Sequence, residues 1–167
     1  MFLLGLGSNL SSSFGDRFVN LDLAVSYLES YKIKIVKKSS FYETQSYPDI
    51  KNPKFINIVV EASTYLSPED LASVLIFIEE KLERKRIKKN EPRTCDIDII
   101  DYNGEVLEFT YKNLIFKVPH ENLIYRNFVL FPLQEIAPRW VHPKNKEIGT
   151  EKELNILGNP VKLTCFY

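Results

Sequence analysis

Residues 95–99 alternate apolar and acidic side chains, and this alternation constrains the fold more than any other feature of the chain. Side chains alternate across a β-strand, so the pattern predicts a strand with one buried face and one polar face. The residues expected on the buried face are Cys95, Ile97 and Ile99. Asp96 and Asp98 then share the opposite face, with Cα atoms about 6.6 Å apart at ~3.3 Å per residue. The chain must therefore build a sheet that presents two parallel carboxylates.

Apolar periodicity elsewhere predicts the remaining elements. Apolar residues three and four apart predict helices over 16–30 and 67–82, the second with Ser67 as N-cap and Pro68 in its first turn. Shorter apolar runs predict strands, at 2–6, 33–42 and 55–62. A hairpin is expected around Asn103-Gly104, because this dipeptide favours two-residue turns. Two short helices are expected after Val118, where prolines interrupt the chain.

The resulting order, β-α-β-β-α-β, predicts an α+β fold of the ferredoxin-like, split β-α-β type: an antiparallel sheet with helices on one side. A chain of 167 residues is expected to form a single domain, spanning 1–167. Lys plus Arg and Asp plus Glu both total 22, so no net charge favours nucleic acid or an anionic membrane as partner. The basic residues are nevertheless concentrated locally, between positions 81 and 93.

Cysteine usage and the N-terminal segment favour a cytoplasmic location by default. Cys95 and Cys165 lie 70 residues apart and show neither CxxC nor zinc-ligand spacing. The apolar run at residues 1–6 is too short for a signal peptide or a membrane span.

The two aspartates lie beside a group of basic residues: Arg84, Arg86, Lys88, Lys89 and Arg93. Parallel carboxylates suit a hard divalent ion that carries phosphate oxygens. The basic group would then form a clamp on polyphosphate, since arginine makes bidentate contacts with phosphate. The alternatives are an acidic strand face and a solvated helix end that complements the helix dipole.

Aromatic residues suggest a second subsite. Phe55 and Phe128 could flank a flat heterocycle, with Asn57 hydrogen-bonding its edge, or both rings could belong to the core. His120 could contact phosphate or cap a helix, and Glu79 could reach a ligand or pair with a nearby cation. The chain has no P-loop, GxGxxG or GxSxG, so Walker-type ATPases, Rossmann enzymes and serine hydrolases are excluded.

Together these motifs resemble one family, the hydroxymethyldihydropterin pyrophosphokinases of folate biosynthesis. The resemblance runs from residue 4 to about residue 143 and rests on LGSNL, SSFYET, FIN, PRTCDIDII, VPH, RNFVLFPLQEIAP and HP, in that order. It implies Mg²⁺-dependent transfer of diphosphate from ATP to the hydroxymethyl group of a reduced pterin, with release of AMP. It also implies a protein that binds neither nucleic acid nor membrane, expected here to be a monomer or weak dimer.

The resemblance assigns roles by position. Two Mg²⁺ ions would be held by Asp96 and Asp98, which act in catalysis with Arg84 and Arg93. The pterin would be bound by Thr44, Tyr47, Phe55, Asn57 and Phe128. ATP would be bound by Glu79, Arg86, Arg93, Ile99, Lys117, His120 and Arg126.

The chain departs from the family pattern at four places. Glu83 replaces a glycine, which predicts that the helix before the basic loop runs longer, and Asn90-Glu91 replaces an Arg-Trp-Gly segment. Lys117 stands where a polar nucleotide contact is frequent, and Phe55 replaces a frequent tyrosine. None of these changes touches Asp96 or Asp98.

Two other functions stay open from the sequence. A ferredoxin-like sheet with exposed aromatics and the 81–93 basic residues could bind RNA, although the chain lacks the RNP signature. A non-catalytic nucleotide-binding relative is the other alternative, raised by the altered loop at Asn90-Glu91.

Overall fold

The computed structural model describes residues 1–88, 90–120, 122–123, 126–146 and 159–164. Its main antiparallel sheet contains β1 (Phe2–Ser8), β2 (Lys34–Lys38), β3 (Phe41–Thr44), β4 (Phe55–Ser63), β5 (Asp96–Tyr102) and β8 (Val161–Leu163). The helices are α1 (Arg17–Ser30), α2 (Pro68–Lys81) and α3 (Asn127–Ile136). A separate hairpin is formed by β6 (Leu107–Tyr111) and β7 (Leu114–Val118).

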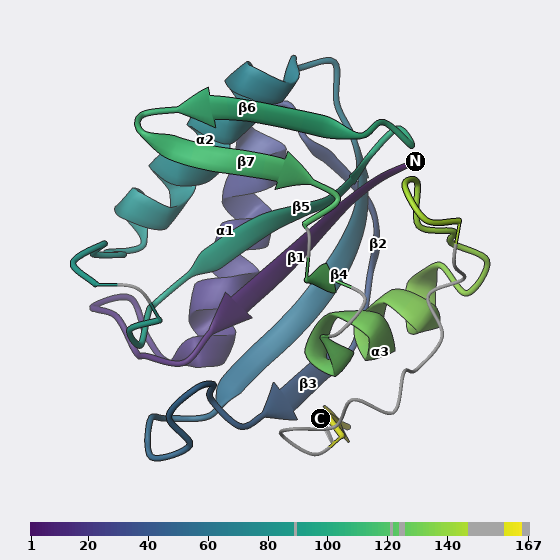
Figure 1. Ribbon diagram of the computed structural model, residues 1–167. Helices are drawn as coiled ribbons and strands as arrows, with labels where there is room; N and C mark the ends of the chain where they lie inside the picture. Colours follow the sequence, from purple (N-terminus) through teal and green to yellow (C-terminus); the bar gives the residue numbers. More distant parts are fainter. Residues whose placement is uncertain (89, 121, 124–125, 147–158, 165–167) are drawn as a thin grey trace.

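The strand order confirms the ferredoxin-like prediction. Strands follow one another as β5-β1-β4-β3-β8, and β2 also pairs with β4, so β2 and β3 together occupy one strand position (Figure 1). Every pairing in this sheet is antiparallel. With α1 after β1 and α2 after β4, this is the split β-α-β order of an α+β domain.

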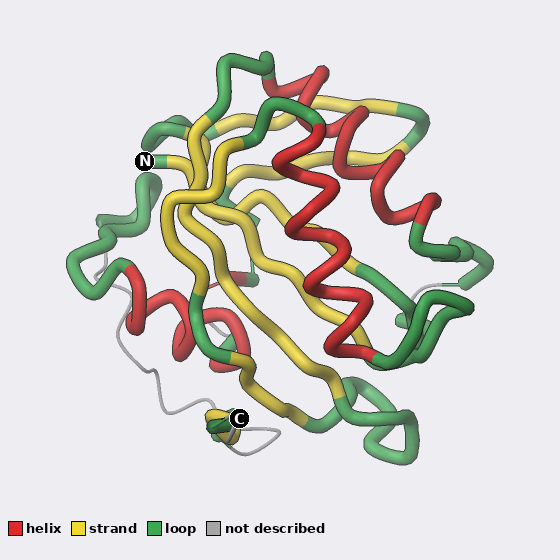
Figure 2. Tube along the Cα trace, turned by 180° about the vertical axis from the view of Figure 1, so that it is seen from behind, coloured by secondary structure: helices red, strands yellow, loops and turns green. Residues whose placement is uncertain are grey.

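Helices α1 and α2 lie side by side across one face of the sheet, as Figure 2 shows. Each begins at a side-chain cap: Asp16 accepts hydrogen bonds from the N–H groups of Phe18 and Val19, and Ser67 accepts one from that of Asp70. The core that they cover includes Leu4, Leu6, Leu21, Leu28, Ile58, Leu75, Cys95, Ile97 and Ile99. The predicted inward face of β5 is therefore buried against the helices.

The third helix, α3, packs on the opposite face, which the sequence had left without a helix. Its core includes Leu3, Val59, Ile100, Leu130, Leu133 and Trp140. The Trp140 Nε1–H donates a 2.7 Å hydrogen bond to the buried Asp101 carboxylate, which ties the segment after α3 to β5. Through this packing, residues 126–128 line the same cavity as Asp96 and Asp98 of β5.

The predicted hairpin at Asn103-Gly104 is wrong, although a turn is present. Both residues have positive φ, 56° and 77°, but β5 pairs with β1 and not with β6. The hairpin forms one turn later, where Lys112 and Asn113 take φ of 47° and 61° between β6 and β7. The turn predicted at Asn103-Gly104 is therefore present, but it does not decide which strand pairs with β5, because β5 pairs with the distant β1.

The predicted extension of the second helix is also wrong. Helix α2 ends at Lys81, and Glu83 takes a left-handed φ of 67° that no continuing helix permits. In the described residues after Val118, one α-helix is found, α3, where two were expected. Cys165 lies outside the described residues, whereas Cys95 is a buried free thiol as predicted.

Candidate active site

A cavity of about 430 Å³ lies on the α3 side of the sheet. Strands β1, β3, β4 and β5, together with residues 120, 122–123 and 126–129, supply its walls, and its floor includes Gly5 and Gly7 of β1. These glycines pair in register with Asp98 and Asp96. A Cβ on Gly7 would lie 3.0 Å from Asn57 Oδ1, so the glycine keeps room for that side chain beside the carboxylates.

Asp96 is surrounded by arginines. Its Oδ1 accepts a 2.6 Å hydrogen bond from Arg84 Nη1, and its Oδ2 accepts a 2.7 Å bond from Arg93 Nε. Burial alone would raise the pKa of Asp96, but the guanidiniums of Arg93 and Arg84 lower it to about 2. Asp96 is therefore ionised at neutral pH and already paired with two cations.

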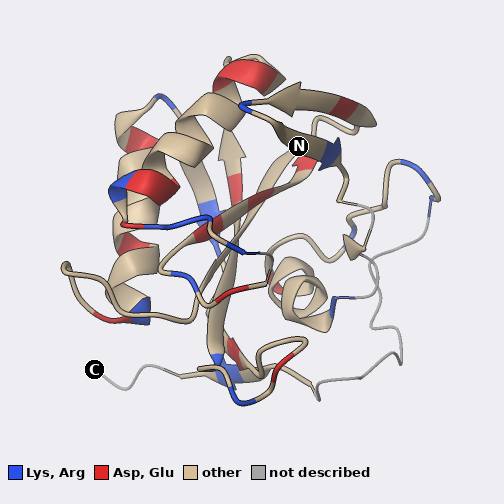
Figure 3. Cartoon of the chain, turned by 60° about the vertical axis from the view of Figure 1, so that its left-hand side comes forward, with Lys and Arg blue, Asp and Glu red and all other residues tan. Residues whose placement is uncertain are grey.

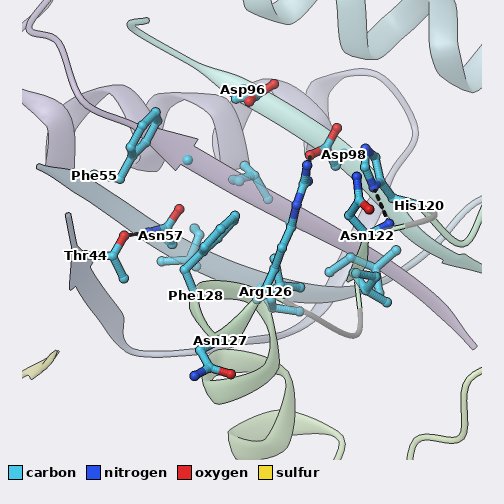
Figure 4. A pocket seen from close by; sticks show the side chains of 18 of the residues that line it. Thr44, Phe55, Asn57, Asp96, Asp98, His120, Asn122, Arg126, Asn127 and Phe128 are labelled. Atoms are coloured by element: carbon cyan, nitrogen blue, oxygen red, sulfur yellow. Dashed lines mark hydrogen bonds and ion pairs between the residues drawn. The ribbon is translucent and has the colours of Figure 1, made fainter. Parts of the chain in front are cut away.

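Asp98 lies in a different environment. Its side chain is 49% exposed, and the nearest cation, Arg126 Nη1, is 3.9 Å from Oδ2 (Figure 4). Although solvent reaches this side chain, the surrounding protein partly desolvates it at the cavity floor, and this together with the charge of Asp96 raises the pKa of Asp98 to about 6. One aspartate of the pair is thus held by arginines and the other remains open to a ligand.

Glu79 holds the arginines from behind the cavity. Its carboxylate, 2% exposed, accepts a 2.8 Å hydrogen bond from the Ile97 N–H and bonds from the guanidiniums of Arg84 and Arg86. Burial raises the pKa of Glu79 to about 7, and the guanidinium charges oppose that rise. Glu79 and Arg86 therefore support the site without lining it. Figure 3 colours the basic residues of the loop that leaves α2 in blue.

All five residues predicted to bind the pterin line the cavity: Thr44, Tyr47, Phe55, Asn57 and Phe128. Asn57 Nδ2 donates a 3.0 Å hydrogen bond to Thr44 Oγ1, which fixes the amide beside the cavity (Figure 4). Two guanidiniums lie near the rings, Arg93 at 5.0 Å from the Phe55 centroid and Arg126 at 5.7 Å from that of Phe128.

The residues predicted to bind ATP divide into two sets. Arg93, Ile99, His120 and Arg126 line the cavity, together with both aspartates. Lys117 is exposed on β7 and is not among the lining residues. The cavity also includes residues that the sequence did not single out: Gln45, Asn122 and Asn127. Asn122 N–H donates a 3.1 Å hydrogen bond to His120 Nδ1, a contact that no spacing in the sequence indicates (Figure 4).

The donor set fits a magnesium ion that arrives with substrate. Among the described residues, no group of three or more His, Cys, Asp or Glu side chains could hold a metal ion without other ligands. Asp96 and Asp98 supply two hard carboxylates, and Mg²⁺ is typically held by one or two carboxylates plus phosphates and water. For Asp96 to bind the ion, Arg84 or Arg93 would have to release its hydrogen bond to one of the carboxylate oxygens.

No helix in the described part of the chain is long and apolar enough to cross a membrane.

Solved structures share the fold. The wild-type HPPK-DHPS protein of Plasmodium falciparum matches with a TM-score of 0.69 at 18% identity, over 88% of this chain and 43% of that one. The chain thus spans less than half of that protein.

Curated sequences are more closely similar. The 2-amino-4-hydroxy-6-hydroxymethyldihydropteridine pyrophosphokinase of Aquifex aeolicus is 37% identical over 84% of this chain and 82% of its own length. That of Bacillus subtilis is 39% identical over 80% of this chain and 76% of its own. A profile of the 7,8-dihydro-6-hydroxymethylpterin-pyrophosphokinase (HPPK) family matches residues 3–138. The chain therefore belongs to the HPPK family, whose members are pyrophosphokinases of folate biosynthesis.

Proposed function

We propose that this chain transfers diphosphate from ATP to the hydroxymethyl group of 6-hydroxymethyl-7,8-dihydropterin and releases AMP. The observation that carries the proposal is one continuous cavity that brings two carboxylates together with two aromatic rings. Asp96 and Asp98 line it with Phe55 and Phe128. Arg93 connects the two groups, since its guanidinium bonds to Asp96 and lies 5.0 Å from the Phe55 centroid. A substrate with a flat ring and a reactive hydroxyl fits such a cavity together with a polyphosphate.

In the proposed reaction, the hydroxyl oxygen of the pterin attacks the β-phosphorus of ATP. The bond between that phosphorus and the oxygen shared with the α-phosphate breaks, AMP leaves, and the hydroxyl proton is released. Arg84 and Arg93 neutralise charge on the phosphates as the bond breaks, since guanidiniums bind phosphate oxygens in bidentate geometry. His120 and Arg126 hold the triphosphate, and Asn57 orients the pterin edge.

Two Mg²⁺ ions would be held by Asp96 and Asp98. When bound, the metal supplies charge neutralisation for the phosphates and a lower pKa for the attacking hydroxyl. Glu79, which also accepts a bond from Arg86, holds the Arg84 guanidinium beside Asp96. Lys117 stays a predicted ATP contact. Because it lies on β7 outside the cavity lining, it would contact ATP only if the nucleotide extended toward β7. The cytoplasmic location and the monomer or weak dimer also stay predictions.

Paired substitutions test the metal assignment. Asp96→Asn and Asp98→Asn should each lower Mg²⁺-dependent kcat/KM by about a hundredfold or more, because each removes a charge that faces the phosphates. Glu108→Gln, an exposed change on β6, serves as the control and should leave turnover unchanged. Either aspartate variant with near-parental Mg²⁺-dependent turnover would show that the assignment is wrong.

A further inference from the structure

Both ends of the basic loop, residues 84–92, are attached to the same segment, residues 9–15. Just before the loop, the Glu83 carboxylate accepts hydrogen bonds from the Ser13 N–H at 2.9 Å and the Ser13 hydroxyl at 2.5 Å. Just after it, the Arg93 N–H donates to Asn9 Oδ1 at 2.7 Å, and the Asn9 N–H donates back to the Arg93 carbonyl at 3.0 Å. The loop therefore spans two attachment points on one support.

Segment 9–15 is itself tightly bonded. Ser12 and Gly15 exchange backbone hydrogen bonds of 2.9 and 3.3 Å. The Ser12 hydroxyl donates to Asn20 Oδ1 on α1, and Asn20 Nδ2 donates to the Leu10 carbonyl, at 2.6 and 2.9 Å. Because Asn20 is fully buried, these bonds fix the segment to the first helix. Ser13 is thus a firm point of attachment although its own surface is exposed.

Glu83 occupies a backbone position that favours glycine. Its φ of 67° lies in the left-handed region, which a residue with a Cβ adopts only at a conformational cost. A glycine would relieve that cost but could not bond to Ser13. The two bonds from Ser13 also lower the pKa of Glu83, so the side chain is a charged acceptor at neutral pH.

We propose that Glu83 is a positioning residue for the diphosphoryl transfer, which makes this inference rest on the proposed function. Glu83 does not line the cavity. The next residue is Arg84, whose N–H donates to the Glu79 carbonyl at 2.9 Å and whose guanidinium bonds to Asp96. Anchoring Glu83 on Ser13 fixes where the loop begins, so Arg84 keeps its place beside Asp96.

Glu83→Gly tests the anchor without risking the fold, because glycine accepts this φ without strain. That relief offsets the loss of the two exposed bonds from Ser13, so the Tm should stay within a few degrees of the parent. We expect kcat to fall about three- to tenfold, with the pterin KM within about twofold of the parent. Trypsin should cut the loop after the exposed Lys85, Arg86 or Lys88 at least about three times faster, as judged by fragment mass. Glu83→Gln keeps one acceptor oxygen and should restore most of both values.

Two outcomes overturn the proposal: parental cleavage and kcat in Glu83→Gly, or faster cleavage with parental kcat. Ser13→Ala gives the matched change on the other partner, and adding it to Glu83→Gly should produce no further loss. The tryptic measurement needs no turnover. If the parent protein forms no AMP that depends on pterin, the proposed function is refuted. If the parent is active but trypsin cleaves it and Glu83→Gly at the same rate, only the anchor is refuted.

Discussion

Removal of the Glu79 carboxylate should destabilise the protein more than most single substitutions. In Glu79→Ala, the buried Ile97 N–H loses its 2.8 Å partner, which costs about 1–3 kcal/mol. Arg84, with a side chain only 11% exposed, keeps Asp96 but loses its second carboxylate, at a cost of about 1–2 kcal/mol. Arg86 is 39% exposed and adds little after solvent screening. The expected loss is about 2–5 kcal/mol.

Glu79→Gln separates the two contributions. The amide oxygen can still accept from Ile97, so only the charge opposite the guanidiniums is removed. Because burial raises the pKa of this carboxyl, its ionised form costs the folded state free energy at high pH, and we expect a change below about 1 kcal/mol. Urea unfolding at a pH above 8 compares the variants with the Glu79 carboxyl of the parent ionised, and the m-value should stay constant. Both variants should also lower kcat, because Arg84 loses the group that directs it. A loss below about 1 kcal/mol in Glu79→Ala would refute this reasoning.

The remaining predictions concern ligands. Phe128→Ala should weaken pterin binding about tenfold or more while affinity for an ATP analogue changes little; equal losses in calorimetry would instead indicate misfolding. Arg93→Ala should raise the affinity of the nucleotide-free protein for Mg²⁺ several-fold, since it frees Asp96 Oδ2, and weaker binding would contradict that competition. Because the pKa of Asp98 is raised to about 6, protons compete with the metal below that pH. Nucleotide-free Mg²⁺ affinity should therefore rise from about pH 5 to 7 and then level off, and a flat profile would exclude Asp98 as a ligand.

The strands and their faces followed from local sequence. The alternation over 95–99 correctly placed Ile97 and Ile99 in the core and the two aspartates on the other face. The local capping signal at Ser67 likewise located the start of α2, and apolar periodicity located α1. These features depend on the periodicity of side chains along a strand or helix and on hydrogen bonds between residues a few positions apart. They can therefore be predicted without the tertiary fold.

The features that were missed depend on contacts between distant segments. The partner of β5 is β1, about ninety residues earlier, so turn chemistry at Asn103-Gly104 did not decide the pairing. The end of α2 is set partly by Ser13, seventy positions before Glu83, which no helical pattern contains. The ion pairs between Asp96 and its arginines were also missed. The sequence indicated a site for metal and phosphate, but it did not indicate that Arg84 and Arg93 bind Asp96.

The most direct test of the account is an analysis of the nucleotide product. The protein is mixed with ATP, Mg²⁺ and 6-hydroxymethyl-7,8-dihydropterin, and nucleotides are separated by chromatography, with pterin-free and EDTA-treated controls. Diphosphoryl transfer predicts AMP in equal amount to pterin diphosphate, and AMP formation that requires both pterin and metal. ADP as the product, or AMP formed equally without pterin, would contradict the proposed reaction.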